Sequence, residues 1–384
     1  MSDYSFSGSS DGSAHSQRLS ANNDSDEESL NSSSPSMYTY DSSRDGPALL
    51  RRIQGRVYNA QNELYLFPAD NTEFARLEKN HLIHLVNLGR LYIEGERVWR
   101  VLARVEGEQK RILDLGTGVG AWAIGMAQEF PHADVVGIDL APNTSASLPP
   151  NCRFEFDDIN LGLPHYYNTF DIVHCRELSN GIKDFGWLIT EAAKCLKPGL
   201  LSALFINFCT CFIYPGGMVL VAEGDSTLFN EHHDVQEMAF GSGGPGQSWL
   251  ARAMFESNNA MRQRGSNVEA RLLGYEFMLL CPLLSEAGER VRMIPIGPWQ
   301  RGATPDEDQR RQIMGILMRQ SYIELTQSMS TMVIQQGYPP ALVQQFRDGT
   351  ENELNNLSVH LCVKWVYSYA TRNNVPCHTV GARP

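Results

Sequence analysis

The sequence predicts a doubly wound α/β fold, in which helices cover both faces of a mainly parallel sheet. Residues Arg111–Gly120 read R-I-L-D-L-G-T-G-V-G, an apolar run that ends in a glycine turn. A stretch with helical periodicity, A-W-A-I-G-M-A-Q-E-F, follows, and a second apolar run, D-V-V-G-I-D-L, contains Asp139. This order predicts a βαβ unit whose glycines let the backbone approach a ligand at a helix N-terminus, with Asp139 placed to bind ribose hydroxyls. The same alternation continues to Asp225, which extends the expected parallel sheet.

The glycine turn fits two kinds of nucleotide-binding site. Gly116, Gly118 and Ala121 satisfy the G-x-G-x-x-[G/A] pattern of dinucleotide-binding folds, which indicates a nicotinamide or flavin enzyme. Gly116, Gly118 and Gly120 equally satisfy G-x-G-x-G, with Asp114 two residues before the first glycine. A carboxylate at that position suits a ligand that carries an ammonium and a sulfonium, and it fits poorly beside a pyrophosphate. Asp114 therefore favours the second pattern.

The segment D-L-G-T-G-V-G resembles motif I of the class I S-adenosylmethionine (SAM) methyltransferases. Later segments continue the resemblance in the same order. They are R-F-E-F-D-D-I at Arg153–Ile159, F-D-I-V-H-C-R-E at Phe170–Glu177, the turn L-K-P-G at Leu196–Gly199, and M-V-L-V-A-E-G-D at Met218–Asp225. The resemblance implies a Rossmann-like class I methyltransferase sheet with an antiparallel last strand, helical cap additions, and SAM as the cofactor.

A finer resemblance extends over about residues 58 to 225. Leu66–His81 resembles the P-x-D-x-x-E-x-x-R-L-x-x-x-H segment of the fungal LaeA-like methyltransferases, and the runs G-A-W-A-I and G-I-K-D-F are similar to the same family. Gly125 stands where family members often carry an acid. The resemblance implies a SAM-dependent methyltransferase that controls secondary metabolism, velvet-type protein partners, and a small-molecule or protein acceptor. The alternative that it leaves open is a SAM-binding regulatory partner with little or no turnover.

The expected site residues lie after the carboxyl ends of the strands, which form the ligand face of such sheets. The residues expected to bind the cofactor are Asp114, Gly116, Thr117, Gly118, Gly120, Asp139, Leu140, Asp157, Asp158 and His174. His174 and Glu223 are the catalytic candidates, because a base helps when the acceptor must lose a proton. His174 fits a hydrogen-bonded structural role equally well. Arg176, Glu177 and Asp225 are further polar candidates at the same edge.

Composition argues against several other classes of protein. A net charge of −12 disfavours direct binding to nucleic acid. No apolar run reaches the roughly 18 residues of a membrane span, and the N-terminus lacks the apolar core of a signal peptide. Eight cysteines without C-x-x-C pairs indicate reduced thiols in an intracellular protein of the nucleus or cytoplasm. His81 and His84 lie three residues apart on an apolar helix without an acidic partner, so we expect no metal site.

The chain divides into three expected parts. Residues 1–46 form a Ser/Asp-rich tail that cannot bury enough apolar surface to fold. Residues 47–107 form a helical cap, in which Tyr58 and Tyr65 serve packing rather than cofactor binding. Residues 108–384 form the methyltransferase domain with a further cap insertion around 236–270. The last strands are expected at Tyr275–Leu284, Val291–Ile296 and Leu361–Tyr369, and a long amphipathic helix at Ile313–Gln336.

Leu200–Gly216 interrupts this regular pattern with an uncharged, apolar run that contains two of the eight cysteines. Without it, Leu196–Gly199 joins Gly217 directly and gives the L-K-P-G-G turn that the resemblance implies before the fifth strand. The segment is either an added strand or partner surface, or translated intron sequence, which we favour because its apolar side chains have no obvious place to be buried. Sequencing of the mature transcript across the join tests this hypothesis. A message that encodes the segment, together with soluble protein that contains it, contradicts the intron hypothesis.

Overall fold

The computed structural model describes residues 49–142, 147–202, 212–214 and 216–377. The predicted tail at residues 1–46 lies outside this range. The described part is built on a seven-stranded sheet of order β10-β11-β9-β6-β3-β4-β5. Its strands are β3 (Lys110–Leu115), β4 (Ala133–Asp139), β5 (Cys152–Phe156), β6 (Ile172–Arg176), β9 (Met218–Phe229), β10 (Leu284–Ile296) and β11 (Leu361–Arg372).

The pairing of the strands confirms the predicted fold class. β5, β4, β3, β6 and β9 are parallel neighbours, and β11 lies antiparallel between β9 and β10. A parallel pair needs a long crossover, which α4 (Ala121–Glu129) supplies between β3 and β4 and α5 (Phe185–Cys195) between β6 and β9. The last strand, β11, needs no such crossover because it is antiparallel to both of its neighbours. The sheet is therefore doubly wound with an antiparallel last strand.

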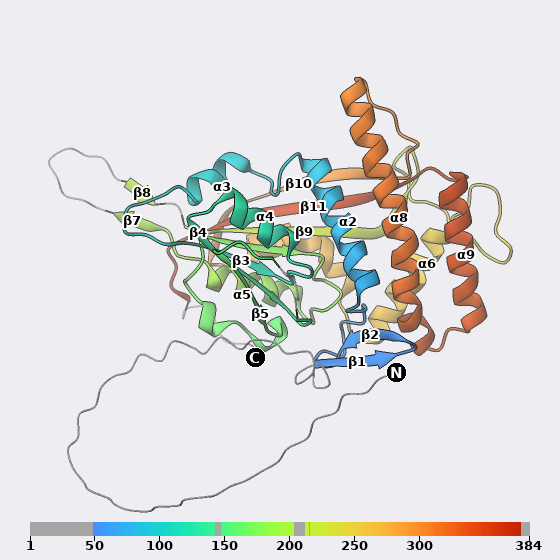
Figure 1. Ribbon diagram of the computed structural model, residues 1–384, viewed down its shortest axis with the longest axis horizontal. Coiled ribbons are helices and arrows are strands. Elements are labelled where there is room, and N and C mark those ends of the chain that lie inside the picture. The colour runs from blue at the N-terminus through green and yellow to red at the C-terminus, as the bar shows by residue number, and fades with distance from the viewer. Residues whose placement is uncertain (1–48, 143–146, 203–211, 215, 378–384) are drawn as a thin grey trace, which may run out of the picture. The chain divides into compact units, whose positions relative to one another are not determined.

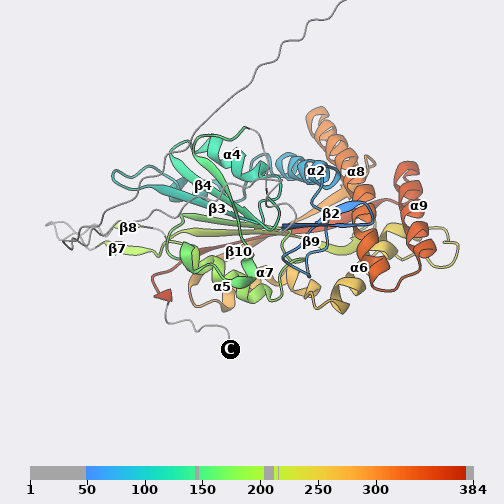
Figure 2. The same cartoon turned by 60° about the horizontal axis from the view of Figure 1, so that its bottom comes forward.

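Alternate residues of each strand pack against different helices. Ile112 and Ile172 belong to a buried cluster with α4 and α3 (Gly95–Val101), while Leu113 and Val173 belong to a second cluster with α5 and α7 (Gly274–Leu280). Figure 2 shows α4 on one side of the sheet and α5 with α7 on the other. Because both faces are covered, the central strands are apolar at successive positions rather than alternating with polar residues.

A third buried cluster joins the far ends of β9, β10 and β11 to a layer of helices. This layer contains α2 (Asn71–Leu88), α6 (Trp249–Gln263), α8 (Pro305–Gln335) and α9 (Pro340–Asn356), which lie together in Figure 1. Thr304 caps α8 by accepting a hydrogen bond from the Glu307 N–H, and Pro305 occupies its first turn. The predicted long helix is thus confirmed and begins earlier than expected, because its polar first turns carry no apolar periodicity.

The N-terminal cap is only partly helical, which corrects our expectation for residues 47–107. Leu50–Ile53 (β1) and Arg56–Asn59 (β2) form an antiparallel hairpin before α2. The Asp70 carboxylate ties the hairpin to α2, since it accepts hydrogen bonds from Arg56 at 2.5 and 2.8 Å and from the Glu73 N–H at 3.2 Å. Gly55, at the turn with φ +82°, is the residue that permits the tight reversal.

One predicted strand is wrong. Tyr275–Leu284 was expected to be a strand because of its apolar, aromatic character, but Gly274–Leu280 is helix α7 and β10 begins only at Leu284. The expectations at Val291–Ile296 and Leu361–Tyr369 are confirmed, as these ranges lie within β10 and β11. A short apolar run does not distinguish a buried helix from a buried strand, which explains the error.

The ends of the segment Leu200–Gly216 meet. Its described strands, β7 (Leu200–Ser202) and β8 (Phe212–Tyr214), pair only with each other, in a two-stranded sheet separate from the seven-stranded one. Residues 203–211 and 215 lie outside the described range. The Gly217 N–H donates to the Lys197 carbonyl at 2.9 Å, so the chain closes its turn across the base of the segment. The two residues that form this closing hydrogen bond both lie outside the segment.

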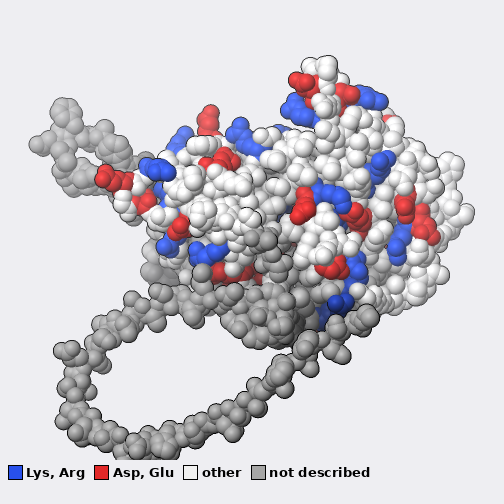
Figure 3. Space-filling view, viewed as in Figure 1, with Lys and Arg blue, Asp and Glu red and all other residues white. Residues whose placement is uncertain are grey.

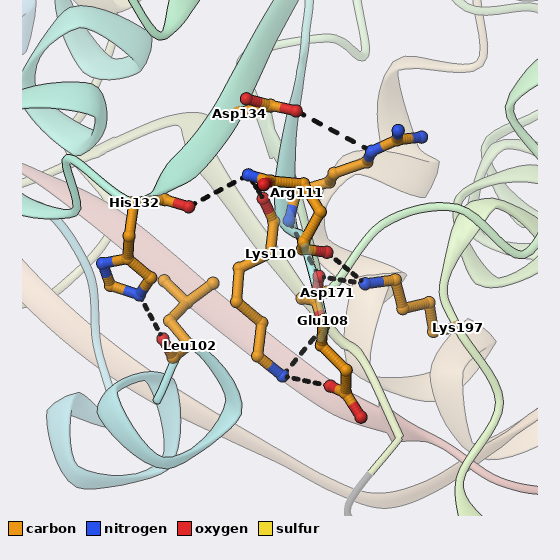
Figure 4. A network of polar contacts seen from close by, with 9 residues as sticks. Leu102, Glu108, Lys110, Arg111, His132, Asp134, Asp171 and Lys197 are labelled. Carbon is orange, nitrogen blue, oxygen red and sulfur yellow. Dashed lines mark hydrogen bonds and ion pairs between the residues drawn. The ribbon is translucent and has the colours of Figure 1, made fainter. Parts of the chain in front are cut away.

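An ion network holds that turn to the amino ends of β3 and β6, as Figure 4 shows. Asp171, 5% exposed, accepts hydrogen bonds from the Arg111 backbone N–H at 2.8 Å and from Lys197 Nζ at 2.7 Å. Lys110 Nζ lies 3.5 Å from the other carboxylate oxygen. These contacts lie at the edge of the sheet opposite to the carboxyl ends of the strands, so they stabilise the fold away from the site described below.

Surface charge is mixed on the face shown in Figure 3, where basic and acidic residues are interspersed around a large uncharged area. None of the described helices is both long enough and apolar enough to cross a membrane. The described cysteines, six in number, are all free thiols.

Candidate active site

A cavity, here called the first cavity, opens where the parallel strands end. It contains about 810 Å³ of empty space, its open mouth included. Its walls come from α2 and the segment before it, the glycine turn, the ends of β4 and β5, and the loop after β6. The lining residues are Tyr65, Leu77, Gly116, Thr117, Gly118, Val119, Ala121, Asp139, Leu140, Asp157, Asp158, Ile159, Asn160, Arg176, Glu177, Leu178, Gly181 and Ile182.

The glycine turn reaches the cavity because its backbone adopts left-handed conformations. Gly116 and Gly118 have φ of +66° and +55°, which L side chains rarely adopt. A Cβ at Gly116 would lie 2.1 Å from Leu178 Cδ2, so the absence of a side chain also lets the loop after β6 close against the turn. The turn leads straight into α4, whose N-terminus favours polar or anionic ligand groups nearby.

Asp139 ends β4 with its carboxylate at the cavity wall. Its Oδ2 accepts a hydrogen bond from the Gly118 N–H at 2.8 Å, and its Oδ1 accepts one from the Ala141 N–H at 3.0 Å. These bonds fix the carboxylate, and each oxygen keeps a lone pair for a ligand hydroxyl. Burial raises the pKa of Asp139 despite these backbone donors.

The structure brings most of the predicted cofactor residues together. Seven of them line the first cavity: Gly116, Thr117, Gly118, Asp139, Leu140, Asp157 and Asp158. The other three, Asp114, Gly120 and His174, are not among the lining residues. Gly120 instead caps α4 with φ +77° and donates its N–H to the Thr117 carbonyl.

Asp114 and His174 form a buried pair beside the glycine turn. His174 Nδ1 lies 2.7 Å from Asp114 Oδ1, and the Thr117 hydroxyl donates to Asp114 Oδ2 at 2.7 Å. The His174 ring stacks on Trp122 with 3.8 Å between centroids and 9° between planes. Burial lowers the pKa of His174 even though Asp114 opposes that shift. These contacts hold His174 beside the glycine turn, and its role in cofactor binding stays a prediction.

Glu223 is a buried anchor for the loop that forms one wall of the first cavity. It lies on β9 and is 2% exposed. Its Oε1 accepts hydrogen bonds from the N–H groups of Leu178 (2.8 Å) and Ser179 (3.3 Å), and its Oε2 accepts one from the Ser179 hydroxyl at 2.9 Å. Desolvation raises the pKa of Glu223 to about 7, against the opposing charge of Arg271.

We expect Glu223 to make stability fall as pH rises. An acid whose folded pKa of about 7 exceeds its unfolded value of 4.5 binds more protons in the folded state between these values, so the free energy of unfolding decreases over this window. The full shift corresponds to about 3 kcal/mol. Urea unfolding at about pH 5 and pH 7.5 measures this decrease, and the free energy of unfolding should fall less between these pH values in Glu223→Gln than in the unaltered protein.

Two features make this comparison specific. Burial lowers the pKa of His174 and lowers that of His81 to about 4, so the contributions of these histidines to the free energy of unfolding rise with pH. Both histidines are present in the unaltered protein and in Glu223→Gln, so their contributions cancel when the two proteins are compared. The exposed Glu276→Gln serves as the control and should follow the unaltered protein. An equal pH response of Glu223→Gln and the unaltered protein would show that Glu223 is not perturbed by burial.

A second cavity adjoins the first at the carboxyl ends of β6 and β9. Its walls combine apolar side chains of the helical layer with buried charges. The lining residues are Phe67, Arg76, Glu177, Ser179, Asn180, Glu223, Gly224, Asp225, Ser226, Met254, Met261, Arg271, Tyr322, Leu325, Met329 and Trp365. Glu177 is a lining residue of both cavities.

Sequence reasoning missed several lining residues and undervalued another. Tyr65, assigned to packing, lines the first cavity, as does Leu77 of α2. Glu177 was named only among polar candidates after the fourth strand, although its φ of +55° marks a strained position for a residue other than glycine. The position of these three residues at the cavity wall depends on contacts between distant parts of the chain, and no local sequence pattern indicates those contacts.

The residues of the first cavity fit SAM. The glycine turn offers backbone that can approach a ligand, since side chains at Gly116 would collide with Leu178. Asp139 offers carboxylate oxygens for ribose hydroxyls, and Leu140, Ile159 and Ile182 offer apolar wall for an adenine ring. Together with acids after β5 for the adenine amino group, these features match the parts of the cofactor.

The sequence of this chain is similar to those of methyltransferases and of a regulator of secondary metabolism. A family model described as a methyltransferase domain matches residues 92–211. The chain is similar to the secondary metabolism regulator laeA of Coprinopsis cinerea, with 34% identity over 251 residues that make up 65% of this chain and 57% of that protein. It is also similar to the methyltransferase pytC of Aspergillus terreus, with 26% identity over 324 residues, 83% of this chain and 86% of that protein. A solved structure of Haemonchus contortus phosphoethanolamine N-methyltransferase 2 has a TM-score of 0.34 and 16% identity, and the match covers 72% of this chain and 52% of that one.

The family model of a methyltransferase domain matches part of this chain, and the sheet has the antiparallel last strand that the resemblance to class I methyltransferases implies. Within that class the chain resembles the LaeA-like methyltransferases of fungi, and its matched segment spans little more than half of the Coprinopsis regulator.

Proposed function

We propose that this protein binds SAM in the first cavity and transfers its methyl group to an acceptor held in the second cavity. The observation that carries the proposal is the joining of a glycine turn, Asp139 and the acids after β5 in one cavity at the carboxyl edge of a class I methyltransferase sheet. When bound, SAM supplies an activated methyl group, so the protein contributes positioning and exclusion of water.

The chain's own residues divide the work of binding. Asp139 holds the ribose hydroxyls, Asp157 or Asp158 accepts from the adenine amino group, and the backbone of Gly116–Gly118 meets the methionine portion. Asp114 and His174 support the turn from beneath through the contacts described above. The acceptor side is formed by the second cavity, whose wall includes Glu177.

Asp139→Ala should weaken SAM binding by roughly 1–3 kcal/mol, because ligand hydroxyls then lack a buried acceptor. Isothermal titration calorimetry with the full chain measures this change. Asp134→Ala, at the opposite end of β4, is the matched control and should retain the affinity of the unaltered protein. Equal SAM affinity in Asp139→Ala and the control would contradict the assignment of Asp139 to the cofactor.

The biological role that we propose is control of secondary metabolism inside the cell, in the nucleus or cytoplasm, in line with the regulators to which the chain is similar. The second candidate function is a SAM-binding regulatory subunit with velvet-type partners and little turnover. Co-purification with such partners, together with SAM binding and no methylated product, supports that second function. Altered metabolites in a deletion strain that return to normal when the strain carries a variant that binds SAM without turnover would point to the same conclusion.

A further inference from the structure

The second cavity contains an acid that no cation neutralises. Within the described part of the chain, Glu177 makes no ion pair, and its Oε2 accepts a hydrogen bond from the neutral side chain of Asn80. Its backbone N–H donates to the Ala222 carbonyl at 3.0 Å, which holds the residue at the end of β6. Burial raises the pKa of Glu177, and the positive charges of Arg76 and Arg176 oppose that shift.

The neighbouring acids are committed to other partners. The Glu73 carboxylate accepts hydrogen bonds from the Arg76 guanidinium at 2.7 and 3.0 Å and from the Ser328 hydroxyl at 2.6 Å. Asp225 pairs with Lys364 at 2.9 Å. Glu223 is occupied by the backbone and side-chain donors of the loop after β6. Glu177 is therefore the acid of this group that remains available to a ligand.

The second cavity also has an apolar part beside its charged residues, which include Arg76 and Arg271. Met254, Met261 and Met329 line it, and their flexible thioethers adapt to varied apolar shapes. Trp365, also a lining residue, is 3% exposed, and its buried indole N–H has no hydrogen-bond partner among the residues that the structure describes. A buried donor without a partner costs free energy that a ligand acceptor atom would recover.

We propose that Glu177 is a catalytic residue that accepts the proton of a hydroxyl group on an uncharged acceptor bound in the second cavity. The hydroxyl proton passes to the Glu177 carboxylate as the hydroxyl oxygen bonds to the methyl carbon, and the bond from that carbon to sulfur breaks, which leaves neutral S-adenosylhomocysteine. This inference rests on the proposed function, because it places the donor in the first cavity. The position of Glu177 between the two cavities supports it.

The test uses 4-nitrophenol, whose phenolate absorbs visible light and so reports its own protonation state. Titration with the full chain, with and without S-adenosylhomocysteine, should raise the pKa of the bound probe by about one unit, because a carboxylate beside the hydroxyl disfavours the phenolate. The shift should disappear in Glu177→Gln. The charged and titratable groups that face Glu177 are Arg76, Glu73, Arg176, Glu223, Tyr65, Tyr322 and Tyr367, and all remain in this variant.

Two controls locate the probe. Met329→Trp should fill the second cavity and abolish probe binding without changing the affinity for S-adenosylhomocysteine, whereas Met329→Leu should keep both. In the unaltered protein, 4-nitrobenzoate, an anion of similar size, should bind about tenfold more weakly than the phenol, because it meets the Glu177 carboxylate. This second comparison needs no variant to fold.

The outcomes separate the two proposals. Absence of S-adenosylhomocysteine binding, with the probe shift intact, overturns the proposed function and leaves the second cavity as a hydroxyl-binding site. Binding of S-adenosylhomocysteine with no probe shift, or with a shift that Glu177→Gln retains, overturns the role of Glu177. Equal binding of 4-nitrobenzoate and 4-nitrophenol overturns the uncharged class of acceptor.

Discussion

Gly118→Val should abolish detectable SAM binding while the protein remains folded. Gly118 has φ +55°, and its N–H holds the Asp139 carboxylate at the cavity wall. A β-branched residue in the left-handed region costs roughly 1–2 kcal/mol, and the shift in backbone that relieves it removes this N–H from Asp139. The Cβ itself would lie 3.3 Å from Leu77 Cδ1, so the remaining methyl groups compete with a ligand for the space that Gly118 lines.

The matched control for this experiment is Gly107→Val. Gly107 also has positive φ, +81°, but a Cβ there meets no atom within 4 Å, and the residue does not line the first cavity. Both variants should lose similar stability in urea unfolding, and Gly118→Val alone should lose the calorimetric signal for SAM. Retained SAM affinity in Gly118→Val would place the cofactor elsewhere.

Glu353→Ala should destabilise the protein by about 1–3 kcal/mol, the cost of leaving buried hydrogen-bond donors without their acceptor. Glu353, on α9, is 4% exposed and holds the N-terminus of α6. Its oxygens accept hydrogen bonds from the Ser248 hydroxyl at 2.8 Å, the Trp249 N–H at 2.6 Å and the Leu250 N–H at 2.9 Å. Truncation to alanine leaves these buried donors without their acceptor, and urea unfolding measures the loss.

Glu351→Ala controls for the removal of an acid from α9, because Glu351 is exposed on the same helix. It should change stability by less than about 0.5 kcal/mol. Glu353→Ala should also retain the SAM affinity of its folded fraction, since Glu353 does not line the first cavity. A loss below about 1 kcal/mol would show that the junction of α6 and α9 relaxes without cost.

The part of the site that the sequence predicts well is local. In β3, the glycine turn and α4, the apolar run, the positive-φ glycines and the helix are consecutive, so their pattern reports their structure directly. Asp139 is predictable for the same reason, because the end of β4 follows from the βαβ unit. The fold class then follows from the repetition of this unit along the chain.

The less predictable part of the site depends on tertiary contacts. Leu178 reaches Gly116 only because Glu223, 45 residues after it in the chain, binds its backbone N–H. His174 and Trp122 come from different elements, and their stacking beside the glycine turn is a tertiary contact. No local periodicity encodes such pairings, and the same limit explains why the hairpin before α2 and the helix α7 were missed.

The most direct test of the central proposal is calorimetric titration of the unaltered full-length protein with SAM and, separately, with NAD. The glycine turn satisfies the sequence patterns of both ligand classes. Asp114 and the acids around the first cavity favour a ligand that carries positive charge, as SAM does on its ammonium and sulfonium groups. We predict saturable binding of SAM with one site per chain and no measurable binding of NAD. Binding of NAD without binding of SAM would contradict the assignment of the cavity and, with it, the proposed methyl transfer.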